Sequence, residues 1–143
     1  MNIKSEQEMI EYGKEFAKKI LTNSNSFNLP IIIELIGDVG TGKTTFVRGF
    51  ANGLGLKESI TSPSFTISKS YALPNNRTLI HYDFYRLNNP GIMKAELEES
   101  LSDKNNIIVI EWADSVANVL PNNRIQINIA YDENDSRKIE IEN

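Results

Sequence analysis

The sequence predicts an α/β fold with a mixed central β-sheet, parallel at its centre and antiparallel at its margins. Two short runs rich in isoleucine, residues 31–36 and 107–110, have the pattern of strands buried on both faces of a parallel sheet. Segments with helical spacing alternate with these runs, as in α/β proteins. Isoleucines alternate with polar residues over 125–129 and again over 139–141, which indicates an antiparallel hairpin with one solvated face.

Three helices are expected from capping residues and apolar spacing. Ser5, followed three residues later by Glu8, forms a capping box, and the apolar residues behind it predict a helix over residues 6–21. A second helix is predicted over residues 44–54, where glycines end it. Residues 90–101 predict a third helix, because proline is favoured in a first helical turn.

Two further strands are expected between the second and third helices. Residues 64–73 and 78–85 have strand composition, and the Pro-Asn-Asn segment 74–76 is a typical turn between them. The turn of the terminal hairpin is placed at residues 132–136. No repeat or linker divides the 143 residues, so we expect one domain over 1–143.

Composition excludes several classes of function. The chain has no cysteine, so disulfides, thiolate nucleophiles and iron–sulfur clusters are ruled out. Fifteen Lys and Arg against nineteen Asp and Glu give a net charge of −4, which argues against direct binding of nucleic acid. Residues 1–12 are too polar for a signal peptide, and the apolar run at 31–36 is too short to cross a bilayer. We expect a cytoplasmic protein with no membrane contact.

The most specific motif is a phosphate-binding loop, residues 37–44, which matches G-x-x-x-x-G-K-[ST] between a buried strand and a helix. Glycines let the backbone N–H groups surround an anion, and the start of the helix adds unpaired donors and a positive dipole end. Lys43 supplies a cation for the β- and γ-phosphates, and the Thr44 hydroxyl can bind Mg²⁺. The alternative is a glycine-rich turn with no ligand. The predicted phosphate-contacting residues are Gly37, Asp38, Val39, Gly40, Thr41, Gly42, Lys43, Thr44 and Thr45.

A phosphate-binding loop needs an acid that holds Mg²⁺, normally at the end of a neighbouring buried strand. Glu111 ends the buried run 107–110 and is our candidate; the alternative is a solvated strand end. Asp83 is a second candidate, for the metal shell or for orienting the attacking water, with an ion pair to Arg86 or to a lysine at a strand end as the competing interpretation. His81 shares its strand face with Asp83, but a lone histidine more often has a structural role, so we leave it out of the mechanism.

A hydroxyl-rich segment lies between the loop's helix and the next strand. Nucleotide switches often place a hydroxyl there that senses the γ-phosphate through Mg²⁺. An ordinary loop is the competing interpretation. The switch-like loop consists of Thr61, Ser62, Pro63, Ser64 and Phe65.

Four motifs in this order resemble the TsaE family, also called YjeE. They are the loop and its extension over residues 37–50, the Thr-Ser-Pro-Ser-Phe segment 61–65, the His-Tyr-Asp-Phe-Tyr-Arg-Leu segment 81–87 and the Ile-Glu-Trp segment 110–112. The resemblance covers almost the whole chain. Members of this family are small P-loop ATPases of bacterial tRNA threonylcarbamoyladenosine (t6A) biosynthesis.

The resemblance implies a three-layer fold like that of P-loop NTPases, binding of ATP and Mg²⁺, and slow hydrolysis. It also implies association with the TsaD–TsaB complex, in which TsaD transfers the threonylcarbamoyl group to adenosine 37 of tRNAs that read codons beginning with adenine. Hydrolysis would reset that complex between turnovers. The tRNA would be held mainly by the partners, which suits the acidic net charge of −4.

Site residues follow from the same resemblance. Lys43 and Thr44 correspond to phosphate and metal ligands, Glu111 to the acidic residue of the metal shell, and Asp83 to a second catalytic acid. Three more residues are implied near the nucleotide: Trp112, Arg137 on the final hairpin, and Ser5 at the start of the first helix.

Two other functions use the same loop. One is a small-molecule or nucleoside kinase, although 143 residues leave little room for a lid. The other is a nucleotide-sensing interaction module without useful turnover. No general base or arginine finger is evident, so we expect slow intrinsic hydrolysis that a partner completes.

Overall fold

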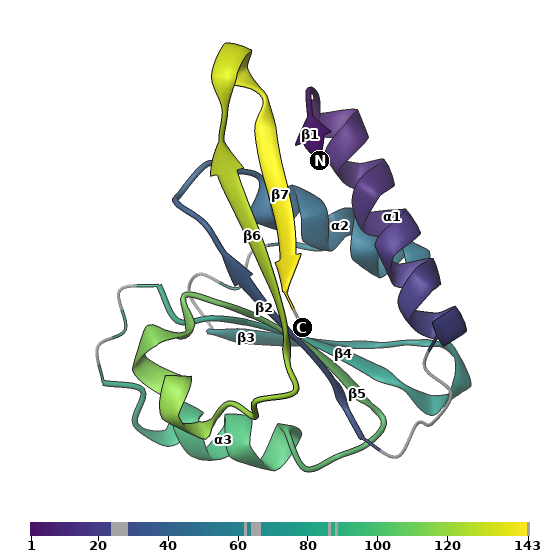
Figure 1. Ribbon diagram of the computed structural model, residues 1–143. Coiled ribbons are helices and arrows are strands. Elements are labelled where there is room, and N and C mark those ends of the chain that lie inside the picture. Colours follow the sequence, from purple (N-terminus) through teal and green to yellow (C-terminus); the bar gives the residue numbers. More distant parts are fainter. Residues whose placement is uncertain (24–28, 62, 64–66, 86, 88, 143) are drawn as a thin grey trace.

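The computed structural model describes residues 1–23, 29–61, 63, 67–85, 87 and 89–142. Its strands form one seven-stranded sheet in the order β1-β7-β6-β2-β5-β4-β3 (Figure 1). The strands have these bounds: β1 Asn2–Ile3, β2 Ile31–Ile36, β3 Ser68–Ala72, β4 Thr78–Asp83, β5 Asn106–Glu111, β6 Ile125–Tyr131 and β7 Arg137–Glu142.

The centre of the sheet is parallel and its margins are antiparallel, which confirms the predicted mixed sheet. Strand β2 pairs in parallel with β5 and β6, and β5 pairs in parallel with β4. The antiparallel pairs are β3 with β4, β6 with β7, and β1 with β7. Since the carboxyl ends of the parallel strands meet at one edge, Leu35 and Asp83 both lie in register with Glu111.

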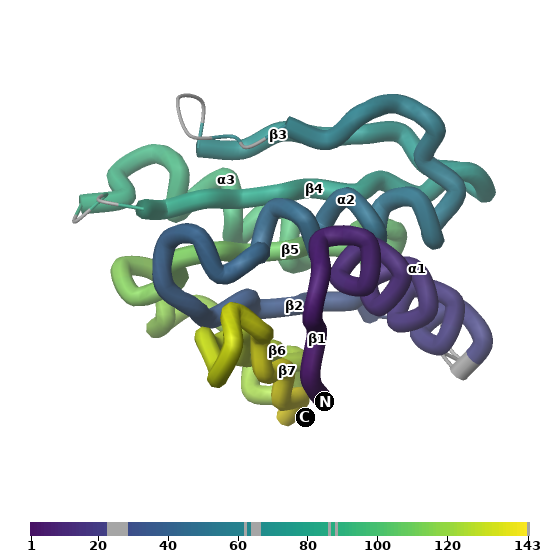
Figure 2. The backbone as a smooth tube through the Cα atoms, turned by 90° about the horizontal axis from the view of Figure 1, so that it is seen from above, coloured from purple at the N-terminus to yellow at the C-terminus, as the bar shows by residue number. Residues whose placement is uncertain are grey.

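Helices cover both faces of the sheet and complete the predicted three-layer fold. Helices α1 (Glu6–Asn23) and α2 (Lys43–Gly53) lie together over one face, as Figure 2 shows. Helix α3 (Ile92–Ser100) and the 3₁₀ helix Ala113–Val119 pack against the other face through Leu97 and Val116. The sheet therefore has a separate apolar core on each side. No helix in the described ranges is both long and apolar enough to cross a bilayer.

Helix α1 begins as its capping box predicts and packs closely on α2. The Ser5 hydroxyl accepts a hydrogen bond from the Glu8 N–H at 3.1 Å. Gly49 of α2 lies against the backbone of Ile10, and Gly13 of α1 lies against the backbone of Phe46, so that a Cβ at either glycine would overlap a carbonyl group. These contacts hold α1 directly against the part of α2 that follows the loop 37–42.

The structure extends or corrects the prediction at four places. The two-residue strand β1 and the 3₁₀ helix Ala113–Val119 were not predicted, because neither has an apolar period of its own. Strand β3 begins at Ser68, four residues later than predicted. Ile141 is 40% exposed although it continues the apolar alternation, because β1 pairs only with the first two residues of β7 and leaves the end of that strand at the margin.

Candidate active site

The loop between β2 and α2 has the geometry of an anion site. Gly42 precedes the first residue of α2 at φ 107° and Gly40 has φ 85°, conformations that favour glycine because it has no Cβ. The Thr41 hydroxyl donates to the carbonyl of Asp38 at 2.8 Å and braces the turn. The first N–H groups of α2 have no partner within the helix and carry the positive end of its dipole. A phosphate group fits this donor set.

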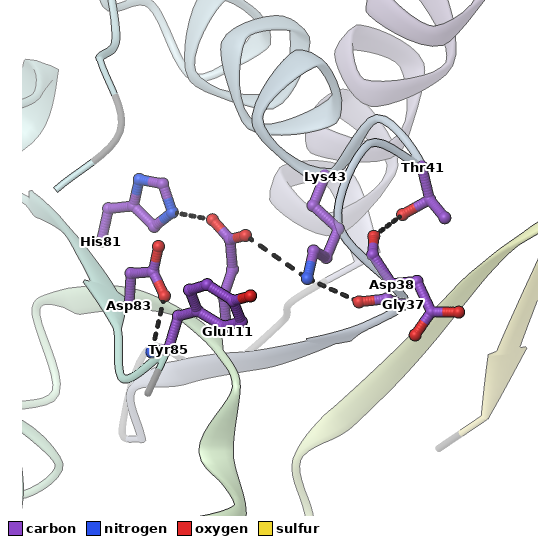
Figure 3. A network of polar contacts seen from close by, with 8 residues as sticks. All are labelled: Gly37, Asp38, Thr41, Lys43, His81, Asp83, Tyr85 and Glu111. Atoms are coloured by element: carbon purple, nitrogen blue, oxygen red, sulfur yellow. Dashed lines mark hydrogen bonds and ion pairs between the residues drawn. The ribbon is translucent and has the colours of Figure 1, made fainter. Parts of the chain in front are cut away.

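Lys43 reaches from the start of α2 across the mouth of the loop, as Figure 3 shows. Its Nζ donates to the carbonyl of Gly37 at 2.6 Å and lies 3.9 Å from Oε1 of Glu111. The ammonium also lies 4.0 Å from the ring centroid of Trp112, within cation–π range. Burial lowers the pKa of Lys43, and the charge of Glu111 opposes that shift.

Glu111 ends β5 as a buried carboxylate. Its residue is 3% exposed, so the alternative of a solvated strand end is wrong. Oε1 faces Lys43, while Oε2 lies 2.5 Å from Nε2 of His81, which is fully buried on β4. The site therefore includes His81, which our sequence reasoning left out of the mechanism. Its position on the same strand face as Asp83 was the available indication.

Asp83 ends β4 beside Glu111. Its Oδ1 accepts a hydrogen bond from the Tyr85 N–H at 2.9 Å, which turns the carboxylate toward the site (Figure 3). Asp83 is half-buried, and burial raises the pKa of its carboxyl group. The competing ion pair with Arg86 concerns a residue outside the described part of the chain.

Two cavities flank the loop and share Gly40, Gly42 and Thr45. The first, of about 400 Å³, lies on the side of the sheet edge. Its lining brings together Val39, Gly40, Gly42, Lys43, Thr44, Thr45, Asp83, Tyr85, Glu111 and Trp112. Trp112 turns into it through a left-handed backbone conformation, φ 56°, and its ring packs on Tyr85 with centroids 4.7 Å apart.

The second cavity, of about 370 Å³, lies between the loop, the start of α1 and the terminal hairpin. Both Ser5 and Arg137 line it, so the two residues implied by the resemblance lie beside the loop. Neither of the acidic strand-end residues, Asp83 and Glu111, lines this second cavity, whereas both line the first. Its lining consists of Ile3, Lys4, Ser5, Glu6, Met9, Gly40, Thr41, Gly42, Thr45, Asp135 and Arg137.

The terminal hairpin holds the loop through two side chains. Arg137 donates from Nε to the carbonyl of Thr41 at 3.2 Å, and the hydroxyl of Tyr131 donates to the carbonyl of Val39 at 3.1 Å. The guanidinium carbon lies 4.4 Å from the Tyr131 ring centroid, so the two side chains also support each other. Tyr131 was missed by sequence reasoning, because nothing in the hairpin pattern places it against the loop.

The switch-like loop lies mostly outside the described residues, which exclude Ser62, Ser64 and Phe65. The Thr61 hydroxyl contacts Nζ of Lys69, and the carbonyl of Pro63 accepts a hydrogen bond from the Ile67 N–H at 2.7 Å. Neither Thr61 nor Pro63 is among the described residues that line the two cavities. The role of the segment 61–65 as a nucleotide switch stays a prediction.

The donor set also limits how a cation could be held. Among the described residues, no cluster of three or more His, Asp or Glu side chains could bind a metal by itself. Glu111 has one oxygen on His81 and the other toward Lys43, so it is placed to act on a cation through water. Thr44 supplies a hydroxyl in the same cavity. A magnesium ion whose remaining ligands are phosphate oxygens and water fits these residues.

Comparison with known proteins decides the family. The family model described as threonylcarbamoyl adenosine biosynthesis protein TsaE matches residues 3–139. The chain belongs to the TsaE family. This confirms the resemblance and places the chain in the biosynthesis of threonylcarbamoyladenosine in tRNA.

Individual members of the TsaE family agree over most of the chain. The tRNA threonylcarbamoyladenosine biosynthesis protein TsaE of Haemophilus influenzae is 32% identical, over 97% of this chain and 85% of the relative. The Bacillus subtilis protein of the same name is 39% identical, over 76% of this chain and 66% of the relative. The crystal structure of Bacillus subtilis YdiB superposes with a TM-score of 0.72 at 32% identity, covering 97% of this chain and 80% of YdiB.

Proposed function

We propose that this chain is an ATPase subunit of tRNA t6A biosynthesis. It binds ATP with Mg²⁺, hydrolyses ATP slowly, and acts on the TsaD–TsaB complex that places the threonylcarbamoyl group on adenosine 37 of tRNAs reading codons that begin with adenine. The observation that carries the proposal is the placement of Lys43 and Glu111, 3.9 Å apart and both buried, at the mouth of a glycine-lined loop.

The loop residues bind the triphosphate in this proposal. Backbone N–H groups from Gly40 to Thr45 surround the β-phosphate, where the start of α2 favours negative charge. The Lys43 ammonium exchanges its hydrogen bond with the Gly37 carbonyl for one with the phosphates. The Thr44 hydroxyl and, through water, Glu111 would hold Mg²⁺. When bound, this cation would neutralise negative charge on the phosphates.

Asp83 orients the attacking water beside Glu111. Asp83 and Glu111 lie in register on adjacent strands and line the same cavity as Lys43. Burial raises the pKa of the Asp83 carboxyl group, so its carboxylate is a better proton acceptor than that of an ordinary aspartate. Arg137 lines the second cavity and not the one that holds Lys43, Asp83 and Glu111, so it is not placed to stabilise a leaving phosphate. Slow intrinsic turnover follows, and a partner speeds it.

The surface beside the cavity supports action on a protein partner. Val39 is 62% exposed and Tyr85 is 40% exposed, and both line the mouth of the cavity that holds Lys43. A partner that covers these apolar side chains would exclude water from the site and order its residues. Because the chain has a net charge of −4, the tRNA is bound mainly by the TsaD and TsaB proteins in this proposal.

An assay of ATP hydrolysis with and without TsaD–TsaB tests the proposal. We expect slow release of ADP and phosphate by the chain alone, faster release with the partners, and loss of both in Glu111→Ala. Glu98→Ala, which removes an exposed carboxylate from α3, is the matched control and should keep wild-type rates. Release of no ADP even with partners would overturn the proposal in favour of a sensing module. Phosphorylation of a small acceptor would overturn it in favour of a kinase.

A further inference from the structure

His81 contacts Glu111 but neither binds nucleotide nor orients water in the proposed function. The two side chains are buried, and Nε2 of His81 lies 2.5 Å from Oε2 of Glu111. His81 lines neither of the cavities that flank the loop, so it lies behind the carboxylate and not at the surface of the site. Figure 3 shows this order: His81, then Glu111, then Lys43.

Strand pairing explains why the two residues meet. Strands β4 and β5 run in parallel with Asp83 opposite Glu111 and His81 opposite Val109. Because side chains alternate along a strand, His81 and Asp83 emerge on the same face, and both reach Glu111 from one neighbouring strand. Asp83 lies at the cavity, and His81 lies two residues deeper.

The second ring nitrogen of His81, Nδ1, identifies the tautomer of the imidazole ring. Within the described part of the chain, Nδ1 is buried and has no hydrogen-bond partner. An N–H buried without an acceptor is less well tolerated than a lone pair without a donor, so the proton belongs on Nε2. Nε2–H then donates to Oε2 of Glu111, which leaves Oε1 as the oxygen that faces Lys43.

We propose that His81 is a positioning residue for the catalytic site: by donating from Nε2 to Oε2, it holds the Glu111 carboxylate in the one orientation that presents Oε1 to Lys43 and the cavity. The inference rests on the proposed function, since it gives Glu111 a reaction to serve. Without His81 the carboxylate keeps its place on β5 but loses its orientation. Hydrolysis falls, whereas nucleotide binding, which the loop provides, does not.

The free chain offers a direct measurement, because His81 is the only histidine in the sequence. Nitrogen NMR of chain labelled with ¹⁵N-histidine, without nucleotide, should show one ring with a protonated Nε2 and an unprotonated Nδ1. Glu111→Ala should replace this pattern with mixed tautomers. Glu111→Gln keeps the shape of the side chain but accepts more weakly, so the Nε2 proton should move upfield. A ring spectrum that neither substitution changes would overturn the proposal.

Hydrolysis by His81 variants is the second measurement. His81→Leu should lower kcat about tenfold, as is usual when a group that orients a metal-shell ligand is lost, and leave the Kd for ADP within about twofold. His81→Gln can place an amide N–H near the position of Nε2 and should recover most of kcat. Ile80→Val, on the opposite face of the same strand, is the control for effects on folding and should keep wild-type kcat.

The outcomes separate the two proposals. Wild-type kcat in His81→Leu, or equal loss in His81→Gln and His81→Leu, would overturn the positioning role while leaving the ATPase intact. A wild-type chain that hydrolyses no ATP with or without partners would overturn the proposed function, and the positioning role of His81 in hydrolysis with it. The ring spectrum of the free chain would still report whether His81 donates to Glu111.

Discussion

The ammonium of Lys43 donates a hydrogen bond to the carbonyl of Gly37 at 2.6 Å, which joins the two ends of the glycine-lined loop between β2 and α2. Lys43 is 6% exposed, and its other neighbours are the Glu111 carboxylate and the Trp112 ring. The loop therefore holds its own lysine in place before any phosphate arrives. A ligand that competes for this lysine must offer more negative charge than a peptide carbonyl, as a triphosphate does.

Lys43→Met should weaken binding of nucleoside triphosphate about 10- to 100-fold. The loss corresponds to one charge-assisted hydrogen bond of about 1.5–3 kcal/mol. Calorimetric titration with ATP and Mg²⁺ measures it. Lys57→Met removes an exposed lysine beyond α2 and is the matched control, for which we expect the wild-type Kd. An unchanged Kd in Lys43→Met would show that the ammonium does not contact the phosphates.

Tyr131→Phe should raise the Kd for nucleotide about two- to fivefold. The substitution removes the hydroxyl that donates to the carbonyl of Val39, a hydrogen bond worth about 0.5–1 kcal/mol at a partly exposed position. The ring, and with it the contact to Arg137, is kept. Fluorescence titration with a labelled nucleotide checks the effect. If affinity is the same in both proteins, the loop keeps its shape without the hydrogen bond from Tyr131.

Gly49→Ala should lower the free energy of unfolding by about 2 kcal/mol or more, because the added methyl overlaps the backbone of Ile10 on α1. At an open helical position the same substitution would instead stabilise by about 0.5–1 kcal/mol. Urea unfolding measures the difference, with Asn52→Ala on the exposed side of α2 as the control. Stabilisation of Gly49→Ala would contradict the close packing of the two helices.

Asp83→Asn should gain stability relative to the wild type as pH rises from about 4 to about 7. Burial raises the pKa of Asp83 above its ordinary value of 3.8, so the folded chain holds this proton more tightly than the unfolded chain does. Ionisation at higher pH therefore costs stability, and asparagine removes that cost while its carbonyl oxygen still accepts from the Tyr85 N–H. Urea unfolding at the two pH values tests the sign. A difference that is constant with pH would show that the pKa is not raised.

The regular elements were predictable because their patterns are local. The isoleucine run of β2 was predicted with its observed bounds, and the alternation in β6 and β7 predicted the hairpin. Helix α2 begins at Lys43, one residue before the prediction, since the loop's glycines mark the boundary. Each of these assignments needs only neighbours in the sequence.

Contacts between distant elements could not be predicted from the sequence in the same way. The pairing of His81 with Glu111 depends on the parallel register of β4 on β5, and the contact of Tyr131 with Val39 depends on the hairpin lying beside the loop. Strand β1 has two residues, too few for any period to show. The burial of Glu111 likewise follows from its neighbours across the sheet and not from residues 107–110.

In the proposed function, the loop of residues 37–44 binds the phosphates of a nucleoside triphosphate. Isothermal titration of the full chain with ATP in the presence of Mg²⁺ measures this binding. We expect one binding event per chain with a Kd in the micromolar range, about −8 kcal/mol, and loss of that heat in a triple variant that also replaces Gly40 and Gly42 with alanine beside Lys43→Met. Absence of binding heat with ATP and with GTP would contradict the claim.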